Sequence, residues 1–198
     1  MKVYVATKNV GKLREIRSMF AGSDFELDTY ADYRDVAEDA PSYIGNALLK
    51  ARALEAQLRD DGIEAAVLAD DSGIEVDALG GRPGVLSARY AGVESSWDQR
   101  LGLLVRELRG VRREQRTARF VCVMALVLPG RESIPSVGIV EGIVTEKPIG
   151  EEGFGYDPIF YYPPFDCTLA QVPEAKKNSV SHRGRAARAL MRAYRDGV

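Results

Sequence analysis

Two consecutive aspartates, Asp70 and Asp71, stand where an apolar segment of the sequence ends. Residues Ala65–Ala69 are predicted to form a short buried strand, and carboxylates directly after such a strand are unfavourable unless something neutralises them. Because adjacent side chains of an extended chain point to opposite sides, we expect one carboxylate to face a site and the other to brace loop N–H groups. Mg²⁺, held by one or two carboxylates and by substrate phosphates, would neutralise the site. The alternative is a turn in which both aspartates are solvated.

A second polar segment lies where a predicted strand gives way to a predicted helix. It consists of Thr7, Lys8, Asn9, Val10, Gly11 and Lys12. Backbone N–H groups, a hydroxyl, an amide and two ammonium groups at a helix N-terminus form a good binding site for an anion, above all for phosphate. The segment is not a Walker A loop, because Leu13 follows Lys12 where that loop has Ser or Thr. The alternative is an ordinary helix start with solvated lysines.

Lys50 shares a helix face with Asn46, four residues earlier, and this face borders the apolar stripe of the predicted helix. A lysine at the edge of a core needs an anion or a carboxylate as partner, unless its ammonium group reaches solvent. Lys50 is therefore a second candidate for contact with a phosphate.

Two further segments carry groups that suit a flat ligand. In Gly153–Pro158, glycines flank Phe154 and would let the backbone approach a ring that stacks on this phenyl group. In Lys177–Gly184, cations stand at the start of the last predicted helix, where the helix dipole disfavours them unless an anionic or carbonyl-rich ligand compensates. A structural turn and a solvated helix face are the alternatives. Together the segments indicate a nucleoside triphosphate bound with Mg²⁺.

The elements that must position these residues alternate between strand and helix, which predicts an α/β protein. Predicted strands are Lys2–Ala6, Phe25–Tyr30, Ala65–Ala69, Ile74–Leu79, Thr117–Leu128 and Ile134–Thr145. Predicted helices are Gly11–Phe20, a helix with Pro41 in its first turn that runs to Arg59, a helix capped by Ser95 or Ser96 that runs to Leu108, and Ser181–Arg195. Asp70–Gly73 is predicted as a polar exit between two strands and Pro173–Val180 as a polar loop. Because the two long strands are adjacent in sequence, we expect a mixed sheet with an antiparallel part.

Composition bounds the classes of protein that remain. With 198 residues, we expect a single domain, 1–198, that buries its own core without metal or disulfide support. A formal net charge of −2 argues against binding to nucleic acid, and no apolar run is long enough to span a membrane. The start of the chain turns polar too soon for a signal peptide, and two cysteines are too few for a disulfide framework. These features predict a cytoplasmic protein.

The chain resembles the inosine/xanthosine triphosphate pyrophosphatase family, which acts on deaminated purine nucleotides. The motifs that carry the resemblance are Thr7–Lys12, Asn46–Ala51, Ala69–Gly73, Pro83–Tyr90, Gly153–Pro158 and Ser181–Gly184. The resemblance implies an elongated mixed sheet flanked by helices, two lobes with a substrate cleft between them, a homodimer, and Mg²⁺-dependent hydrolysis of ITP, dITP, XTP or dXTP to the monophosphate and pyrophosphate.

The resemblance also implies roles for individual residues. Asp71 would be the base for the attacking water, Glu38 and Asp71 would serve the metal, and Ser72 would touch the substrate. Lys50 and the segment Thr7–Lys12 would hold the triphosphate. The base pocket would consist of Phe154, Gly155, Tyr156, Asp157, Lys177, His182 and Arg183. Many relatives carry Glu where this chain has Gly45, so a carboxylate is absent there. A non-catalytic nucleotide sensor or an RNA-binding protein is the alternative function.

Overall fold

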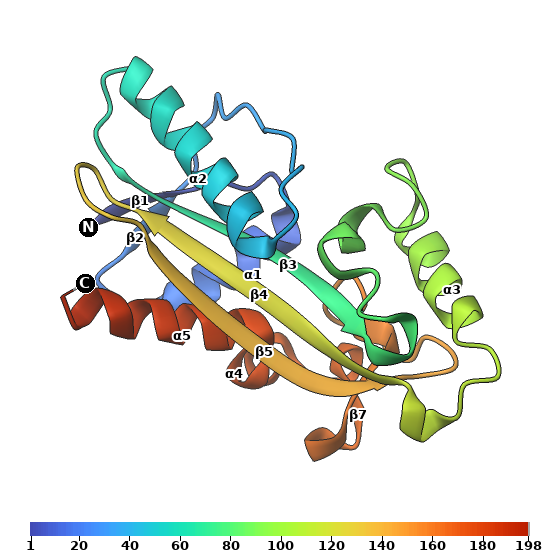
Figure 1. Ribbon diagram of the computed structural model, residues 1–198. Coiled ribbons are helices and arrows are strands. Elements are labelled where there is room, and N and C mark those ends of the chain that lie inside the picture. Colours follow the sequence, from blue (N-terminus) through green and yellow to red (C-terminus); the bar gives the residue numbers. More distant parts are fainter. Residues whose placement is uncertain (198) are drawn as a thin grey trace. The chain divides into compact units, whose positions relative to one another are not determined.

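A computed structural model describes residues 1–197 and contains a seven-stranded sheet with the strand order β2-β1-β3-β4-β5-β6-β7 (Figure 1). The strands are β1 (Lys2–Val5), β2 (Glu26–Asp28), β3 (Ala66–Val76), β4 (Thr117–Val127), β5 (Ile134–Val144), β6 (Phe160–Tyr162) and β7 (Cys167–Thr168). β1 pairs in parallel with β2 and β3, whereas β6 pairs antiparallel with β5 and β7. The predicted mixed sheet is therefore confirmed.

Residues 1–197 contain five α-helices, which lie between or after the strands. They are α1 (Val10–Phe20), α2 (Tyr43–Asp60), α3 (Trp97–Glu107), α4 (Glu174–Val180) and α5 (His182–Arg195). No helix among the described residues is both long and apolar enough to cross a membrane. The α/β class predicted from the alternation of elements is confirmed.

The chain divides into two compact units. The first unit contains Met1–Asp71, Cys122–Gly138 and the chain from Arg183 onward, and the second contains Ser72–Val121 and Ile139–His182. The chain therefore passes from one unit to the other directly after Asp71 and directly after His182. The single domain and the substrate cleft stay predictions.

In the first unit, α1 and α5 cover one face of the sheet and α2 covers the other (Figure 1). Strand alternation explains this division, because successive side chains point to opposite faces. In β3, Ala66 and Leu68 pack with the apolar residues of α1 and α5, whereas Val67 and Ala69 pack against α2. The same alternation continues in β3, so Asp70 lies on the face of α1 and α5, and Asp71 lies on the face of α2.

The second unit has its own core, built around α3. Leu101, Leu104 and Leu108 pack with Ile74, Val76 and residues of β4, β5 and β6. A reciprocal capping box starts α3, because the Ser96 hydroxyl accepts from the Gln99 N–H and the Gln99 side chain accepts from the Ser96 N–H. The predicted cap at Ser96 is confirmed.

The predicted break between two strands at Asp70–Gly73 is wrong. β3 runs without interruption from Ala66 to Val76, so both aspartates lie inside a strand. They remain extended because ionic and hydrogen-bonding side chains of other elements satisfy their carboxylates, which removes the need for a solvated turn. The strand predicted to end at Leu79 also ends earlier, at Val76, and a 3₁₀ turn follows.

Two helix predictions also need correction. Pro173–Val180 is not a loop, because Glu174–Val180 forms α4. The loop was predicted because the segment is polar, but its polar residues Lys177 and Asn178 are buried in the helix. Pro41 is not in the first turn of α2, which begins at Tyr43 behind the N-cap Ser42. Serine is a better N-cap because its hydroxyl accepts the Gly45 N–H, at 3.2 Å.

Gly45 lies in the first turn of α2, where there is no room for a side chain. A Cβ there would lie 2.6 Å from the Ala40 Cβ and 3.1 Å from the Ser42 hydroxyl. The segment before α2 therefore packs directly over the glycine. A larger side chain at this position would require this segment to shift.

We expect Gly45→Ala to lower the free energy of unfolding, although alanine is the better helix former by about 1 kcal/mol. Gly102→Ala in α3 is the matched control, because its Cβ would meet only the flexible Arg106 side chain, at 3.8 Å. Gly102→Ala should therefore leave stability unchanged or raise it. Urea unfolding of both variants measures the difference, and a gain of stability in Gly45→Ala would refute the tight packing.

Candidate active site

The side chains of Asp70 and Asp71 point to opposite faces of β3, as predicted for adjacent residues of a strand. Asp70 is 1% exposed and faces α1 and α5, whereas Asp71 is 4% exposed and faces α2. The two carboxylates therefore have different partners.

The Asp70 carboxylate belongs to a buried ion network. Its Oδ2 accepts from Arg183 Nε at 3.2 Å and lies 3.3 Å from Lys12 Nζ. Arg183 also donates from Nη1 to Glu15 Oε2 at 2.6 Å. Burial by itself would lower the pKa of Arg183, but Asp70 and Glu15 raise it, so the guanidinium stays charged in the core. Cations of this network, in place of the expected loop N–H groups, brace Asp70.

Glu15 is a member of this network that the sequence reasoning missed. It is 1% exposed on α1 and precedes Ile16, a residue of the apolar core. A carboxylate next to the apolar stripe of a helix needs a cation, by the same argument that singled out Lys50. That argument, applied to acids as well as to lysines, would have found it.

On the other face, Asp71 and Lys50 lie among the polar groups of α2 and the segment before it. Asn46 donates from Nδ2 to Asp71 Oδ2 at 3.0 Å, and its Oδ1 accepts from the Ala40 N–H at 3.0 Å. Lys50 donates to Glu38 Oε1 at 3.0 Å and to the Asp70 carbonyl at 2.6 Å. The expected carboxylate partner of Lys50 is thus Glu38, which is itself half-buried.

The charges of this cluster act on one another. Burial raises the pKa of Asp71, against the opposing effects of Lys50, Lys12 and the Asn46 hydrogen bond, while Glu38 raises it further. Burial would lower the pKa of Lys50, but Asp70, Glu38 and Asp71 together raise it. Asp71 is therefore a carboxylate whose ionised form the protein alone does not fully compensate.

The pair Glu38 and Asp71 fits Mg²⁺. Hard oxygen ligands suit this ion, which is commonly held by one or two carboxylates and substrate phosphates. No group of three or more His, Cys, Asp or Glu side chains that could hold a metal occurs within residues 1–197. Substrate oxygens and water would have to supply the remaining ligands of the ion. Its charge, added to those of Lys50 and Lys12, would favour the ionised form of Asp71.

The segment Thr7–Lys12 connects β1 to α1. Asn9 is the N-cap, and its Oδ1 accepts the Lys12 N–H at 3.0 Å, while its own N–H donates to the Thr7 hydroxyl at 3.2 Å. Within the described part of the chain, the N–H groups of Val10 and Gly11 have no acceptor. Two N–H groups at a helix start, with Lys8 and Lys12 beside them, suit a phosphate oxygen.

In the second unit, Gly153–Asp157 forms a tight turn around a buried ion pair. Lys177 forms an ion pair with Asp157 Oδ2, which also accepts the Phe154 N–H at 2.9 Å. Lys177 Nζ lies 4.9 Å from the centre of the Phe154 ring. A Cβ on Gly153 would come within 2.3 Å of Asp157 Oδ2, and the φ of Gly153 is 73°, so only glycine fits. The ion pair thus joins Lys177 of α4 to the turn, twenty residues earlier in the chain.

The other predicted pocket residues have different surroundings. His182 is buried in the second unit and stacks on Phe120, with ring centres 4.7 Å apart. Tyr156 is only 3% exposed and lies in the core around α3. Arg183, the next residue after His182, lies in the first unit with Glu15 and Asp70, and Ser72 follows Asp71 in β3.

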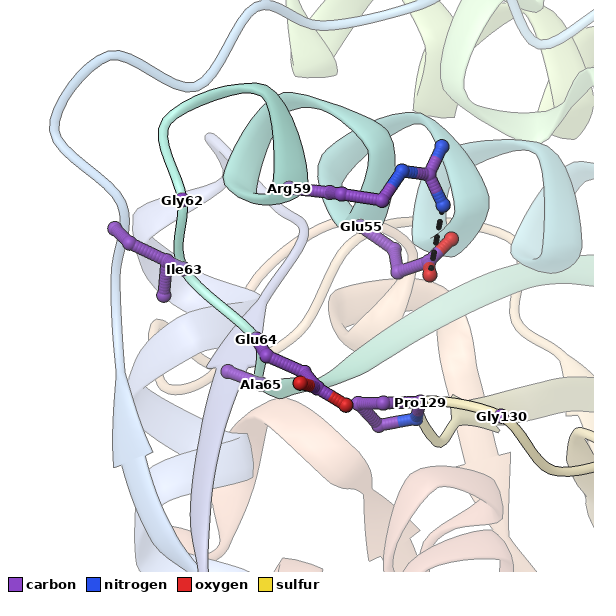
Figure 2. A pocket seen from close by; sticks show the side chains of 8 residues that line it. All are labelled: Glu55, Arg59, Gly62, Ile63, Glu64, Ala65, Pro129 and Gly130. Atoms are coloured by element: carbon purple, nitrogen blue, oxygen red, sulfur yellow. Dashed lines mark hydrogen bonds and ion pairs between the residues drawn. The ribbon is translucent and has the colours of Figure 1, made fainter.

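A cavity of about 370 Å³ lies at the C-terminal end of α2 (Figure 2). Its lining residues are Glu55, Arg59, Gly62, Ile63, Glu64, Ala65, Pro129 and Gly130. Arg59 and Glu55 form an ion pair of 3.3 Å in its wall, one helical turn apart. None of the predicted site residues lines this cavity.

Comparison with known proteins identifies the family. Residues 3–193 match the Ham1 family. The chain belongs to this family. It is 45% identical over 188 residues to the dITP/XTP pyrophosphatase of Geobacillus kaustophilus, covering 93% of this chain and 90% of that protein. A dITP/XTP pyrophosphatase of Thermus thermophilus is 45% identical over 199 residues, covering 100% of this chain and 93% of that protein.

Solved structures agree with this assignment. The Staphylococcus aureus Ham1 protein superposes with a TM-score of 0.85 at 36% identity, covering 100% of this chain and 99% of that one. A HAM1 protein from Coxiella burnetii gives a TM-score of 0.88 at 31% identity, with full coverage of both chains. The resemblance stated from the motifs is confirmed.

The two aspartates should respond to neutralisation in opposite ways. Asp70→Asn leaves Lys12 without its carboxylate and Arg183 with Glu15 alone, and breaking a buried ion pair typically costs about 3–5 kcal/mol. Asp71→Asn removes a charge that burial disfavours, so the free energy of unfolding should stay equal or rise. Because the folded-state pKa of Asp71 is raised, its destabilising effect is present above that pKa and disappears as pH falls below the unfolded value.

Urea unfolding at about pH 7.5 without metal compares the two variants with the wild type, in a range where a solvated aspartate is fully ionised. A loss of stability in Asp71→Asn as large as that in Asp70→Asn would contradict the division of roles.

Proposed function

We propose that this protein hydrolyses deaminated purine nucleoside triphosphates, namely ITP, dITP, XTP and dXTP, to the monophosphate and pyrophosphate. The names of its relatives, which match it over nearly their full lengths, support this activity. The observation that carries the mechanism is Asp71, a buried carboxylate held by Asn46 and placed among Lys50, Lys12 and Glu38. A nucleotide sensor without catalysis would not need such a carboxylate.

The triphosphate would be bound by cations and N–H groups of the first unit. Val10 and Gly11 offer their backbone N–H groups. Thr7, Lys8 and Asn9 form the loop before α1, and Lys12 lies in the first turn of this helix. Lys50 would add a charge from α2. Lysines act on phosphates as point charges, and they stabilise the negative charge that spreads over the phosphate oxygens during transfer.

Glu38 and Asp71 would hold Mg²⁺. When bound, this ion supplies charge neutralisation on the phosphate oxygens. Asp71 would accept the proton of the water that attacks the α-phosphorus, and the hydrogen bond from Asn46 keeps its carboxylate in one orientation. A raised pKa makes Asp71 a stronger base than a solvated aspartate, and the neighbouring lysines favour its ionised form.

The base would be recognised by the second unit and the start of α5. Phe154 offers a ring face, and Gly155 and Asp157 shape the turn that presents it. Lys177, His182 and Arg183 are the donors expected near the 6-carbonyl oxygen of hypoxanthine or xanthine, and Ser72 is expected to touch the substrate. Adenine carries an amino group at position 6, so donor would face donor. Tyr156 was expected in this pocket as well, but its hydroxyl donates to the Ser87 carbonyl, so we propose that it supports the turn instead of binding the base.

The remaining expectations are proposals about the setting of the enzyme. We propose a homodimer in the cytoplasm that takes a nucleoside triphosphate as its partner and binds neither nucleic acid nor membrane. The formal net charge of −2 supports the proposal that the protein does not bind nucleic acid.

The direct test is release of pyrophosphate from ITP with Mg²⁺, compared with ATP and with Asp71→Asn. Wild-type protein should hydrolyse ITP with a kcat/KM that exceeds the value for ATP, by as much as about 10⁴-fold if unpaired donors reject adenine. Asp71→Asn should fold normally and lose at least about 10²–10⁴-fold in kcat, the usual contribution of a general base. Absence of pyrophosphate release would overturn the function, and wild-type turnover in Asp71→Asn would remove this residue from the mechanism.

A further inference from the structure

Tyr156 belongs to the glycine-rich turn but points away from its polar groups. Its side chain is 3% exposed and its ring packs in the core around α3. Burial raises the pKa of its hydroxyl, which therefore stays protonated and donates to the Ser87 carbonyl oxygen at 2.9 Å. The hydroxyl is thus an anchor point for the turn.

Ser87 joins three segments of the second unit. It is 4% exposed in the 3₁₀ segment Gly84–Arg89. Its hydroxyl accepts the Ile74 N–H at 2.9 Å and donates to the Gly84 carbonyl at 2.6 Å, while its carbonyl accepts from Tyr156. The hydroxyl therefore fixes the 3₁₀ segment to β3, and the carbonyl fixes the turn to the 3₁₀ segment.

Trp97, at the start of α3, packs against Tyr156 and Gly155 of the turn. Its ring packs edge-on against Tyr156, with centres 5.5 Å apart, and lies 3.5 Å from the point where a Cβ on Gly155 would stand. Arg100 stacks over Trp97 at 4.9 Å and donates to the Val93 carbonyl at 3.1 Å. The half-buried Trp97 therefore packs against the turn at both Tyr156 and Gly155.

We propose that Ser87 is a positioning residue that sets base selectivity by holding, through Tyr156, the turn that carries Phe154 and Asp157. The inference rests on the proposed function, in which this turn faces the base. Ser87 itself is buried and makes no contact with substrate in this account. It acts because Tyr156 lies between Phe154 and Asp157 in the chain, and displacement of binding groups by about 1 Å can cost as much as about 10²-fold.

Two variants test the anchor from its two ends. Ser87→Ala removes the hydroxyl that fixes the carbonyl, and Tyr156→Phe removes the donor while keeping the ring. The matched control is Tyr90→Phe, because the Tyr90 hydroxyl donates to Glu107 and not to the turn. The kinetic measurement is kcat/KM for ITP and for ATP with Mg²⁺, together with the midpoint of thermal unfolding.

We expect the ratio of the two kcat/KM values to fall about 10- to 100-fold in both anchor variants, through a higher KM for ITP more than through a lower kcat. Tyr90→Phe should keep the wild-type ratio. A merely structural role would lower the unfolding midpoint and leave the selectivity of the folded protein unchanged. Because Tyr156→Phe keeps the packing of the ring, it decides the question if Ser87→Ala fails to fold.

Trp97 provides a second readout, since it is the single tryptophan of the sequence. Titration with IMP should change its fluorescence in the wild type, and the midpoint should move about tenfold or more to higher IMP concentration in both anchor variants. Wild-type selectivity and wild-type IMP binding in both folded variants would overturn the role of Ser87 alone. Failure of the wild type to prefer ITP over ATP would overturn the proposed function, and the role of Ser87 with it.

Discussion

Two adjacent carboxylates inside one buried strand are the constraint on which the first unit depends. Neither Asp70 nor Asp71 could remain extended and buried in β3 without compensating groups. Because they point to opposite faces of the sheet, the compensation has to come from two different sets of elements. On one face α1 and α5 supply Lys12 and Arg183, and on the other face α2 supplies Asn46 and Lys50. The helices that complete the core are thus the helices that carry the charges.

The two faces are not equivalent. Arg183 is bound by both Asp70 and Glu15, so opposite charges lie in direct contact on that face and the pKa of the guanidinium is raised. Around Asp71 the balance is less complete, since burial still raises the pKa of its carboxyl. A site that binds a cation and a polyanion must leave such an imbalance for its ligands to correct. From this difference we propose a structural role for Asp70 and a chemical role for Asp71.

Much of this arrangement could be predicted from residue types and periodicity. Local rules predict the opposite orientation of the two aspartates, a helix cap at Ser95 or Ser96, and an anion or a carboxylate as the partner of Lys50; the structure has Ser96 and Glu38. The partners themselves do not, because Arg183 lies 113 residues from Asp70 and 168 from Glu15, and nothing local specifies that pairing. The predicted break in β3 was wrong for the same reason. A run of polar residues is typical of a turn, and the distant cations that stabilise it inside a strand are not evident from the local sequence. The segment of α4 was likewise predicted as a loop because it is polar. Its Lys177 is buried in an ion pair with Asp157, which the sequence around it does not indicate.

The position of the bound divalent cation distinguishes the roles of the two aspartates. Mn²⁺ can replace Mg²⁺ at sites made of oxygen ligands and is visible by anomalous X-ray scattering. A crystal of the wild-type protein with Mn²⁺ and IMP should show an anomalous peak within coordinating distance of the carboxylates of Asp71 and Glu38. A peak beside Asp70 or Glu15, on the face of Arg183, would contradict the division of roles between the two aspartates.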